Sequence, residues 1–461
     1  MVLEKIHKHR LIVFWAALVI GLFLRYFKLE ETVFFDADQE NFAWTAVRLL
    51  EEKRPVLIGL KAGEFPVFIG PLMYYVYALF FQLFSMDPAG LSYLSMIFAF
   101  LSIVSIFFIS SRVFGNKAGL LSVFLYSFSF FFIDNDRRVW LPGPMIILSL
   151  WLFYFLWRVN NREQKKWLII LGMIFFLGFQ LHITALFFFL IAIIGVLVKR
   201  IKVGWSSAVL GLGTAFLGII PVIIFDLRHG FINFKGWQTL FVRAGEKVNY
   251  FSRFLNLVRY NLENEVRIFS LPINLTTKTV AGLIFLYWVV QSLRKGKNQK
   301  SLRLAWLWII VPFLVFLPVN LHIPEYYLIL TFPILLIVTS TLIINLSQRL
   351  KLVRLIAPIA LLTFLVVNLR MTLGQEIDKA IFLHYKKQAV DYVIKEAESK
   401  DFSVFYEMDR GYNYGYDYLF YWKLGKIPEK SQEPDFIIVV PWNYKGLSLT
   451  ERFGGVGVIK K

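Results

Sequence analysis

The sequence has no cysteine among its 461 residues. This absence excludes a disulfide framework, a thiol nucleophile and a metal site built on cysteine. Charge is also scarce, because only 18% of the residues are Asp, Glu, Lys or Arg. Hydrophobic residues make up 57% of the chain and aromatic residues 18%, and the mean hydropathy is +0.61. Soluble domains seldom have this composition, which is typical of a helical protein that crosses a membrane several times.

Acidic residues are fewer than basic ones, and the net charge is +19. A basic chain could bind nucleic acid, so the positions of the charges decide their meaning. Six polar segments between apolar runs, 49 residues in all, hold 20 Lys or Arg and only two acids. By the positive-inside rule all six are cytoplasmic, and we expect a lipid bilayer and no nucleic acid as partner. The segments are 1–10, 111–117, 158–166, 199–204, 294–303 and 348–354.

Eleven apolar runs are candidate membrane-spanning helices, although several are short for a hydrocarbon core about 30 Å thick. We therefore predict an all-α, multi-pass protein of the cell membrane with a transmembrane domain over residues 1–369. Its amino terminus is cytoplasmic and retained, because Arg25 and Lys28 stand where a cleavable signal has small residues. The runs are 11–29, 91–110, 118–133, 143–157, 167–181, 183–198, 205–225, 279–293, 304–319, 326–347 and 355–369.

This topology places the loops 30–90 and 226–278 on the outer face, together with residues 370–461. The last segment predicts a small extracytoplasmic α/β domain, with a charged helix within 375–400 and strands at 402–406, 436–440 and 456–459. Residues 71–84 are rich in Tyr and Phe, and counting them as a span would put every later basic segment on the wrong side. We predict that they form a helix in the outer membrane interface.

An acidic loop directly follows the first span and contains Asp36, Asp38 and Glu40. Carboxylates at the mouth of a membrane bundle are costly to desolvate, so they are usually hydrated, paired, bound to a metal or used in chemistry. The helical spacing of apolar residues from Phe42 onward predicts an interfacial helix after the loop. Asp36 and Asp38 are candidates for catalysis; the alternative is that one of them only caps this helix.

Two further outer segments carry candidate substrate-binding residues. In the first, Glu64 precedes Tyr74 and Tyr75 of the aromatic interfacial helix, and it lines a cavity or faces water. The second, residues 134–144, places Arg137 and Arg138 on the outer side, against the positive-inside pattern. Arginine is well suited to bidentate recognition of a lipid phosphate, whereas the plainer interpretation is pairing with neighbouring aspartates. Trp140 completes this set of candidates.

Polar residues at three other helix ends complete a ring around one mouth. A single histidine at an interface is more often a satisfied polar group than a catalyst, whereas three of them at helix ends favour a site. The candidates are His182, Arg228, His229, His322 and Glu325.

Four passages together resemble the GT-C glycosyltransferases, in particular bacterial protein O-mannosyltransferases and aminoarabinose transferases. The likeness covers about residues 10–350, and the order of the passages is more specific than any one of them. The passages are Asp36-Ala-Asp-Gln-Glu-Asn, Gly63 to Tyr75 with its Gly-Pro-Leu-x-Tyr-Tyr core, Arg137-Arg-x-Trp-Leu-Pro and Asp226-Leu-Arg-His-Gly-Phe-x-Asn.

The resemblance implies transfer of a sugar from a polyprenyl-phosphate carrier to a glycan, lipid or protein acceptor outside the membrane, with inversion. It implies an acid of the first loop as general base, Asp36 by position and Asp38 second. Glu64 would line the donor or acceptor cavity, and Arg137 or Arg138 would hold the phosphate. Many relatives have Asp-Glu where Ala37 here separates two aspartates. This Asp-x-Asp spacing leaves open both the identity of the base and a divalent cation, Mg²⁺ or Mn²⁺, on Asp36 and Asp38.

Three other functions compete with this interpretation. An ion-coupled transporter or flippase usually has ionisable residues in mid-membrane and internal repeats, and the sequence shows neither beyond Arg25 and Lys28. A scaffold protein would use the outer loops only to bind a partner. A lipid-linked oligosaccharide ligase or polymerase would share the compartment but transfer a chain from a diphosphate carrier.

Overall fold

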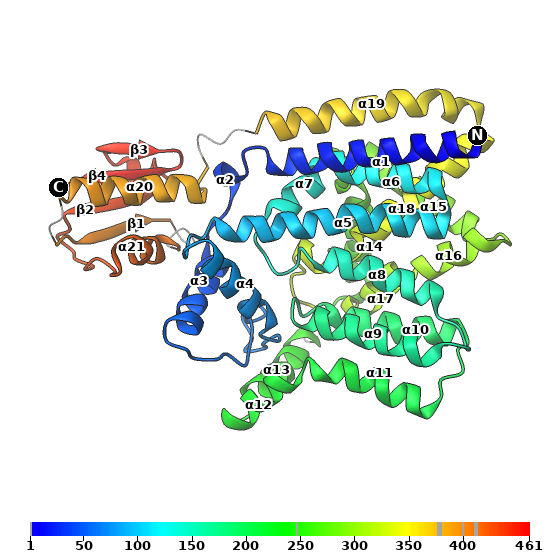
Figure 1. Ribbon diagram of the computed structural model, residues 1–461, viewed down its shortest axis with the longest axis horizontal. Helices are drawn as coiled ribbons and strands as arrows, with labels where there is room; N and C mark the ends of the chain where they lie inside the picture. The colour runs from blue at the N-terminus through cyan, green and yellow to red at the C-terminus, as the bar shows by residue number, and fades with distance from the viewer. Residues whose placement is uncertain (1, 246–247, 376–379, 399–400, 410–413) are drawn as a thin grey trace.

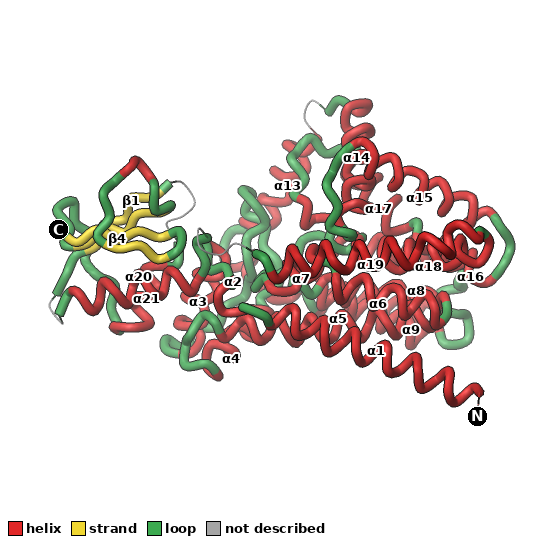
Figure 2. Tube along the Cα trace, turned by 90° about the horizontal axis from the view of Figure 1, so that it is seen from above, coloured by secondary structure: helices red, strands yellow, loops and turns green. Residues whose placement is uncertain are grey.

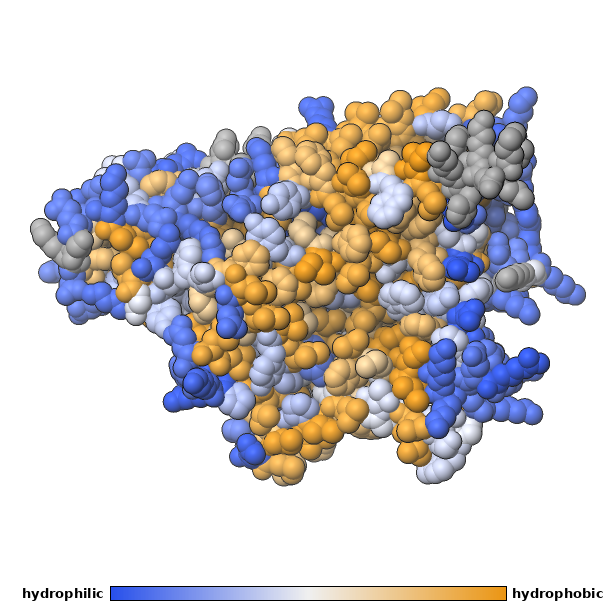
Figure 3. Space-filling model, viewed as in Figure 1, coloured by the Kyte–Doolittle hydropathy of each residue, from blue (hydrophilic) through white to orange (hydrophobic). Residues whose placement is uncertain are grey.

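The computed structural model describes residues 2–245, 248–375, 380–398, 401–409 and 414–461. It consists of a bundle of roughly parallel and antiparallel helices with a small sheet-containing domain at one end (Figure 1). Figure 3 shows an apolar band between two hydrophilic ends, as expected of a protein in a bilayer. The six basic segments lie together at the end of the bundle opposite the sheet domain. The end next to the sheet domain is called the outer end after the predicted topology, which stays a prediction.

Each predicted apolar run coincides with one helix or with two consecutive helices. Within the described residues, four helices are long and apolar enough to cross a membrane, and two bent pairs raise this number to six. The count of eleven spans stays a prediction, since the other helices are shorter or less apolar. The bundle helices are α1 (Val2–Tyr26), α5 (Gly90–Phe114), α6 (Asn116–Phe128), α7 (Phe130–Arg137), α8 (Met145–Arg158), α9 (Gln164–Phe179), α10 (Ala185–Val198), α11 (Trp205–Leu217), α12 (Ile220–Arg228), α15 (Leu275–Leu293), α16 (Lys297–Ala305), α17 (Leu307–Phe316), α18 (Phe332–Arg349) and α19 (Lys351–Leu373).

The break between α6 and α7 bends the chain by 63°. A bend in lipid leaves backbone N–H groups without helical partners, and neighbouring side chains must satisfy them. Here the N–H of Phe130 donates to Oδ1 of Asn368 (2.7 Å) and that of Phe131 donates to Oγ of Ser270 (2.9 Å). The bend turns α7 across the outer end of the bundle and places residues 134–140 over its mouth.

Small residues allow α9 and α11 to pack closely. A Cβ atom on Gly172 would lie 2.2 Å from the carbonyl oxygen of Gly211, so a larger side chain at this position would force the helices apart. Close backbone approach through glycine is a common way for helices to associate in a bilayer, where no hydrophobic effect drives them together.

The outer loop 30–90 forms three helices: α2 (Leu29–Thr32), α3 (Ala37–Leu50) and α4 (Leu72–Leu83). The helix expected at 71–84 is therefore present, and α3 begins directly after the first aspartate. The two helices α3 and α4 pack against each other beside the outer end of the bundle (Figure 1). Phe42 of α3 contacts the rings of Tyr74 and Tyr77 of α4, with centroids 5.9 and 4.5 Å apart.

The loop 226–278 contains two helices that hydropathy did not predict, α13 (Ile232–Gly245) and α14 (Tyr250–Arg267). Helix α14 is amphipathic and packs on α15, α17 and α18. Its buried Glu265 accepts a hydrogen bond from Thr339 of α18 (2.6 Å), which satisfies one carboxylate oxygen inside the bundle. This helix carries Arg267 to the outer mouth.

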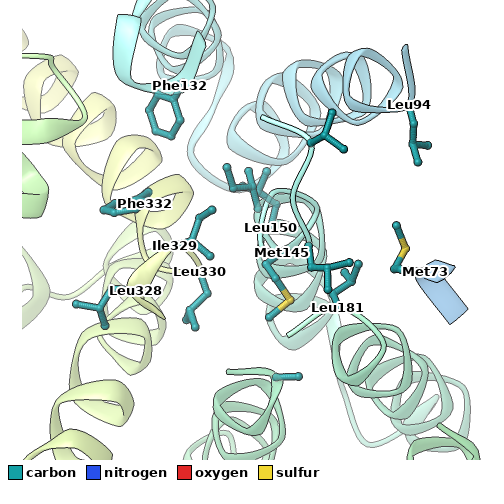
Figure 4. Packing of buried hydrophobic residues seen from close by; sticks show 14 of the residues in the cluster. Met73, Leu94, Phe132, Met145, Leu150, Leu181, Leu328, Ile329, Leu330 and Phe332 are labelled. Carbon is teal, nitrogen blue, oxygen red and sulfur yellow. The ribbon is translucent and has the colours of Figure 1, made fainter. Parts of the chain in front are cut away.

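The segment between α17 and α18 contains a short 3-10 helix, η1 (Glu325–Leu328). In Figure 4, Ile329 and Leu330 point toward Met145 and Leu150 of α8. The carbonyl of Leu330 also accepts a hydrogen bond from Ser149 of α8 (2.5 Å). The packing anchors the segment, so that η1 presents its side chains to the outer mouth.

The carboxyl-terminal domain has a four-stranded sheet in the order β1-β2-β4-β3, with β1 parallel to β2 and the other pairs antiparallel. Helices α20 (Leu383–Glu396) and α21 (Tyr416–Leu424) lie on the same side of this sheet (Figure 2). Helix α20 lies within the predicted charged helix, of which 376–379 and 399–400 fall outside the described residues, while β3 and α21 were not predicted. The strands are β1 (Val404–Met408), β2 (Phe436–Val440), β3 (Glu451–Phe453) and β4 (Val456–Lys460).

Candidate active site

Two cavities open side by side at the outer end of the bundle. The larger has a volume of about 650 Å³ and lies between α7, the end of α14, η1 and α19. The smaller, of about 350 Å³, lies between α3, the loop 60–63 and the turn at 181–183. Trp140 and Tyr326 line both cavities, and their rings meet edge to face with centroids 5.8 Å apart. The two side chains therefore form a shared aromatic wall.

Asp38 lies on the wall of the smaller cavity, as the second residue of α3. Its side chain is accessible from the cavity, and its carboxylate has no hydrogen-bonding or ionic partner among the described residues. The protein around it removes much of the bulk water; this loss of solvation, together with the negative charge of Asp36, raises the pKa of Asp38. A carboxylate with unused acceptor capacity and a raised pKa is suited to take up a proton.

Asp36 has a different environment, although only one residue separates it from Asp38. It is the N-cap residue of α3, and its backbone N–H donates to Oε1 of Gln39 (3.0 Å), as in a capping box. Its carboxylate accepts a hydrogen bond from Nζ of Lys386 in the carboxyl-terminal domain (3.1 Å). The capping interpretation weighed for the two aspartates thus applies to Asp36, and its acceptor capacity is partly used.

The two neighbouring arginines also differ. Arg137 is buried, and its guanidinium donates to the carbonyls of Leu24, Arg25 and Phe27 at distances of 2.5–3.1 Å. It therefore joins α7 to the end of α1. Arg138 instead lines the larger cavity, where it pairs with Asp134 at 2.6 Å.

Arg138 is the better placed of the two for a ligand. Its guanidinium lies 5.5 Å from the ring centroid of Trp140 and 5.9 Å from that of Phe34. The pairing with aspartate that the sequence allowed is therefore present, but Arg138 is still partly exposed at the cavity. An anion in the cavity could compete with Asp134 for this guanidinium.

Arg267, His322 and Glu325 bring further polar groups to the larger cavity. Arg267 forms an ion pair with Glu325 at 2.5 Å, and both side chains are partly exposed. His322 lines the same wall. Arg267 was not among the sequence candidates, because it ends a polar helix that hydropathy did not separate from the loop.

His182 lies at the smaller cavity, between the rings of Tyr326 and Tyr327, with centroids 5.7 and 5.1 Å away. Burial lowers the pKa of His182 to about 3, so its imidazole is neutral at physiological pH. Its Nδ1 is 2.9 Å from Oγ1 of Thr184. A neutral ring held in this way can offer a hydrogen bond to a ligand without adding a charge.

The remaining sequence candidates line neither of the two cavities. Tyr74 donates to Asn41 (2.5 Å) and Tyr75 donates to the carbonyl of Val56 (2.9 Å), so both hold the interfacial helices in place. Glu64 is exposed in the loop beyond Gly63. Arg228 is exposed at the end of α12, and the ring of His229 stacks on that of Phe225 at 4.1 Å.

The nearby motif residue Asp226 is buried and has a local role. Its carboxylate accepts hydrogen bonds from the backbone N–H groups of Asn233 (2.7 Å) and Phe234 (2.9 Å). The side chain of Asn233 in turn accepts from the N–H of Phe68 (2.7 Å). The fourth motif therefore fastens the turn between α12 and α13 to the first outer loop.

A divalent cation on Asp36 and Asp38 does not fit the residues that surround them. The described part of the chain has no group of three or more His, Cys, Asp or Glu side chains arranged to hold a metal ion. The ammonium of Lys386 already binds one oxygen of the Asp36 carboxylate, so a cation on the two aspartates would lie beside a buried positive charge.

Comparisons with known proteins match the chain to membrane glycosyltransferases. Residues 68–225 match the family described as dolichyl-phosphate-mannose-protein mannosyltransferase. ArnT from Cupriavidus metallidurans, bound to undecaprenyl phosphate, has a similar structure over 97% of both chains, with a TM-score of 0.59 and 12% identity. The oligosaccharyltransferase of Archaeoglobus fulgidus, in complex with Zn and sulfate, is similar over 94% of this chain and 68% of that chain, with a TM-score of 0.51 and 11% identity.

This chain has the GT-C glycosyltransferase fold. The resemblance seen in the sequence is thus confirmed, and the likeness to ArnT extends the GT-C fold from the bundle through the carboxyl-terminal domain. An uncharacterized protein of Aquifex aeolicus (strain VF5) is 27% identical over an alignment of 333 positions, which covers 67% of this chain and 61% of that protein. The chain therefore spans less than two thirds of the length of that relative.

Proposed function

We propose that this protein is a glycosyltransferase that moves a sugar from a polyprenyl-phosphate carrier to an acceptor hydroxyl. One observation carries the proposal: an unpartnered carboxylate, Asp38, lies on one side of the Trp140–Tyr326 wall, and Arg138 and Arg267 lie on the other. Group transfer from a phosphate needs a base for the acceptor and positive charge for the leaving group. The smaller cavity has the carboxylate that would act as the base, and the larger cavity has the positive charge. Trp140 and Tyr326 lie between them.

The larger cavity suits an amphipathic lipid phosphate. One side of the cavity carries the polar groups of Arg138, Arg267 and His322. The other side is lined by apolar residues from α7, the loop before α15, and the first turn of α18. A phosphate would bind the guanidinium groups while an isoprenoid chain covers the apolar side. These apolar residues are Phe130, Phe131, Leu271, Ile273 and Phe332.

The smaller cavity suits the acceptor. With an acceptor hydroxyl beside Asp38, the carboxylate would take the hydroxyl proton as the oxygen attacks the anomeric carbon of the sugar. The bond between that carbon and the phosphate oxygen breaks, and its electron pair leaves with the phosphate, where Arg138 and Arg267 stabilise the charge. Attack from the face opposite the leaving group inverts the anomeric centre. Of the two candidate bases in the sequence, Asp36 and Asp38, we therefore propose Asp38 as the base.

The likeness to ArnT with undecaprenyl phosphate supports a polyprenyl-phosphate donor, and the match to a mannosyltransferase family supports sugar transfer. We propose that the reaction takes place on the outer face of the cell membrane, with the amino terminus in the cytoplasm. The acceptor would be a glycan, a lipid or a protein. The carboxyl-terminal domain would then be extracytoplasmic, next to the mouth of both cavities.

The test is release of free carrier lipid from a panel of radiolabelled polyprenyl-phosphate sugars by purified protein in nanodiscs. We expect release by the wild type and loss of release in Asp38→Asn, with no loss of thermal stability in the variant. Glu52→Gln is a matched control, because it neutralises an exposed acid just after α3, away from both cavities. Equal release by Asp38→Asn and the wild type would refute the assignment of the base. Turnover only of diphosphate-linked donors would favour an oligosaccharide ligase instead.

A further inference from the structure

The carboxyl-terminal domain is built directly against the acidic loop. The N–H of Leu383 donates to the carbonyl of Val33 (2.8 Å), immediately before the loop. Gly415 has a φ of +93°, and a Cβ atom there would lie 2.7 Å from the ring of Phe35 and 2.9 Å from its carbonyl oxygen. A side chain at position 415 would therefore push the domain off the loop, and glycine permits both the contact and the backbone conformation.

Lys386, on α20, is the polar centre of this contact. Its side chain is fully buried, and Nζ donates to the carbonyls of Phe35 (2.7 Å) and Tyr414 (3.0 Å) and to Oδ1 of Asp36 (3.1 Å). Nζ also lies 5.4 Å from the ring centroid of Tyr416. Two of its three hydrogen bonds thus fix consecutive residues at the start of α3.

A buried ammonium group is costly unless it is paired, and well-packed apolar residues would often serve stability equally well. The charged and titratable groups that face Lys386 are Asp36 and Glu40 of the first outer loop and Tyr416 of α21. The carboxylate of Glu40 itself accepts hydrogen bonds from backbone N–H groups of the carboxyl-terminal domain, at Gly415 and Tyr418. The first turn of α3 is therefore held from outside by groups of a separate domain.

Asp38 stands in this same turn, and the turn determines where its carboxylate points. We propose that Lys386 is a positioning residue that, through Asp36, fixes the first turn of α3 so that Asp38 faces the acceptor cavity. This inference rests on the proposed function and adds to it a role for the carboxyl-terminal domain, which becomes part of the catalytic unit. Lys386 touches neither cavity, so it acts only through the loop.

The matched pair of variants is Lys386→Met and Lys387→Met. Lys387 is the next residue of the same helix and ties the same domain to Asp87 at 2.5 Å, but it does not contact the acidic loop. We expect Lys386→Met to lower kcat by about 10- to 100-fold, because a misplacement of about 1 Å can have an effect of that size. The KM for the donor should stay unchanged, since Arg138 and Arg267, the proposed phosphate-binding residues, line the other cavity. Lys387→Met should keep the wild-type kcat.

A double-mutant cycle tests the route through Asp36. If Lys386 acts through Asp36, the variant Asp36→Asn/Lys386→Met loses no more activity than the more impaired single variant. Losses that multiply would overturn the proposal, as would a wild-type kcat in Lys386→Met. An equal loss of kcat in Lys387→Met would also overturn the proposal, because general weakening of domain docking would then explain the loss in Lys386→Met.

Hydrogen–deuterium exchange gives a readout that does not depend on turnover. We expect faster exchange of the backbone amides of residues 37–41 in Lys386→Met than in Lys387→Met, with equal exchange in the helices of the bundle. Unchanged exchange in the first turn of α3 would overturn the proposal even if no donor is turned over. Failure of the wild type to release carrier lipid would refute the proposed function separately, so the two outcomes are distinguishable.

Discussion

Two clusters of charged residues lie close together at the outer end of the bundle, and they differ in how their polar groups are satisfied. In the buried cluster, Arg25 donates to Asp136 (2.7 Å) and to three backbone carbonyls, and Tyr126 donates to the second oxygen of Asp136 (2.9 Å). In the cavity cluster, Asp38 has no partner among the described residues and Arg138 has one exposed ion pair.

The difference separates structural charges from charges available to a ligand. A buried ion pair with all its hydrogen bonds made has no capacity left for a substrate, and breaking it leaves an uncompensated charge. An accessible carboxylate beside a cavity costs less in folding and can exchange water for an acceptor. The short segment from Asp134 to Arg138 contributes to both clusters, so position in the sequence alone does not show which role a charge has.

The largest expected effect is on the buried cluster. Arg25→Met should destabilise the protein by about 3–5 kcal/mol, because it leaves Asp136 buried without its cation. The measurement is the yield and thermal melting of the purified protein in detergent. A melting curve like that of the wild type would show that the buried pair does not determine stability.

Replacement of the unpartnered carboxylate should affect activity rather than folding. Asp38→Asn should lower kcat by about 10²- to 10⁴-fold, the usual contribution of a general base. Its folding should be unaffected or slightly improved at neutral pH. Thermal melting and carrier-lipid release, measured on the same preparation, check both expectations, and a loss of melting cooperativity would contradict the comparison.

Removal of the cavity arginine should weaken donor binding. Arg138→Met should raise the KM for the polyprenyl-phosphate donor by about 10-fold or more, since a hydrogen bond to a charged group contributes about 1.5–3 kcal/mol. Arg138→Lys should recover only part of the lost donor affinity, because lysine lacks the bidentate geometry of arginine. An unchanged donor KM in both variants would remove Arg138 from the phosphate site.

The pH dependence of activity and stability follows from the raised pKa of Asp38. The base must be ionised, so kcat should fall as the pH drops through this pKa, which burial raises above the usual value for an aspartate. The carboxyl binds a proton more tightly in the folded than in the unfolded protein, so its ionisation lowers stability as the pH rises. Asp38→Asn should therefore be more stable than the wild type at neutral pH, with the difference vanishing below the pKa of an unfolded aspartate.

The smallest effect is expected at a candidate that the structure places in the helix packing of the outer loop. Tyr75→Phe removes the hydroxyl that bonds to both backbone groups of Val56, at 2.9 and 3.1 Å. Stability should fall by about 0.5–1.5 kcal/mol with activity unchanged. A loss of turnover in a variant that remains folded would show that Tyr75 belongs to the active site.

The sequence predicted those parts of the fold that depend on hydropathy and turns. Long apolar runs predicted the helices of the bundle, and the aromatic segment 71–84 predicted α4. Helix α14 was missed because its buried Glu265 and Asn264 make its segment look like a polar loop. Glu265 is buried where it meets Thr339 of α18, which lies far along the chain.

The sequence predicted several residues that line the cavities, but it did not predict what each side chain contacts. Asp38, Arg138 and His182 do line the two cavities. The direction of a side chain decided the rest: Arg137 ends α7 and points back to α1, whereas Arg138 follows the helix and points to the cavity. Lys386 could not be found from sequence, because nothing near it suggests a partner 350 residues away.

The contact between Asp36 and Lys386 also bears on how the protein is made. The acidic loop leaves the ribosome early, and its buried partner follows 350 residues later. At synthesis rates of ~5–20 residues per second, this delay lasts roughly 20–70 s. During that time the first turn of α3 lacks its contact with the ammonium group of Lys386. The cell therefore completes the acidic loop only when the last domain folds, and nascent chains are expected to be inactive until then.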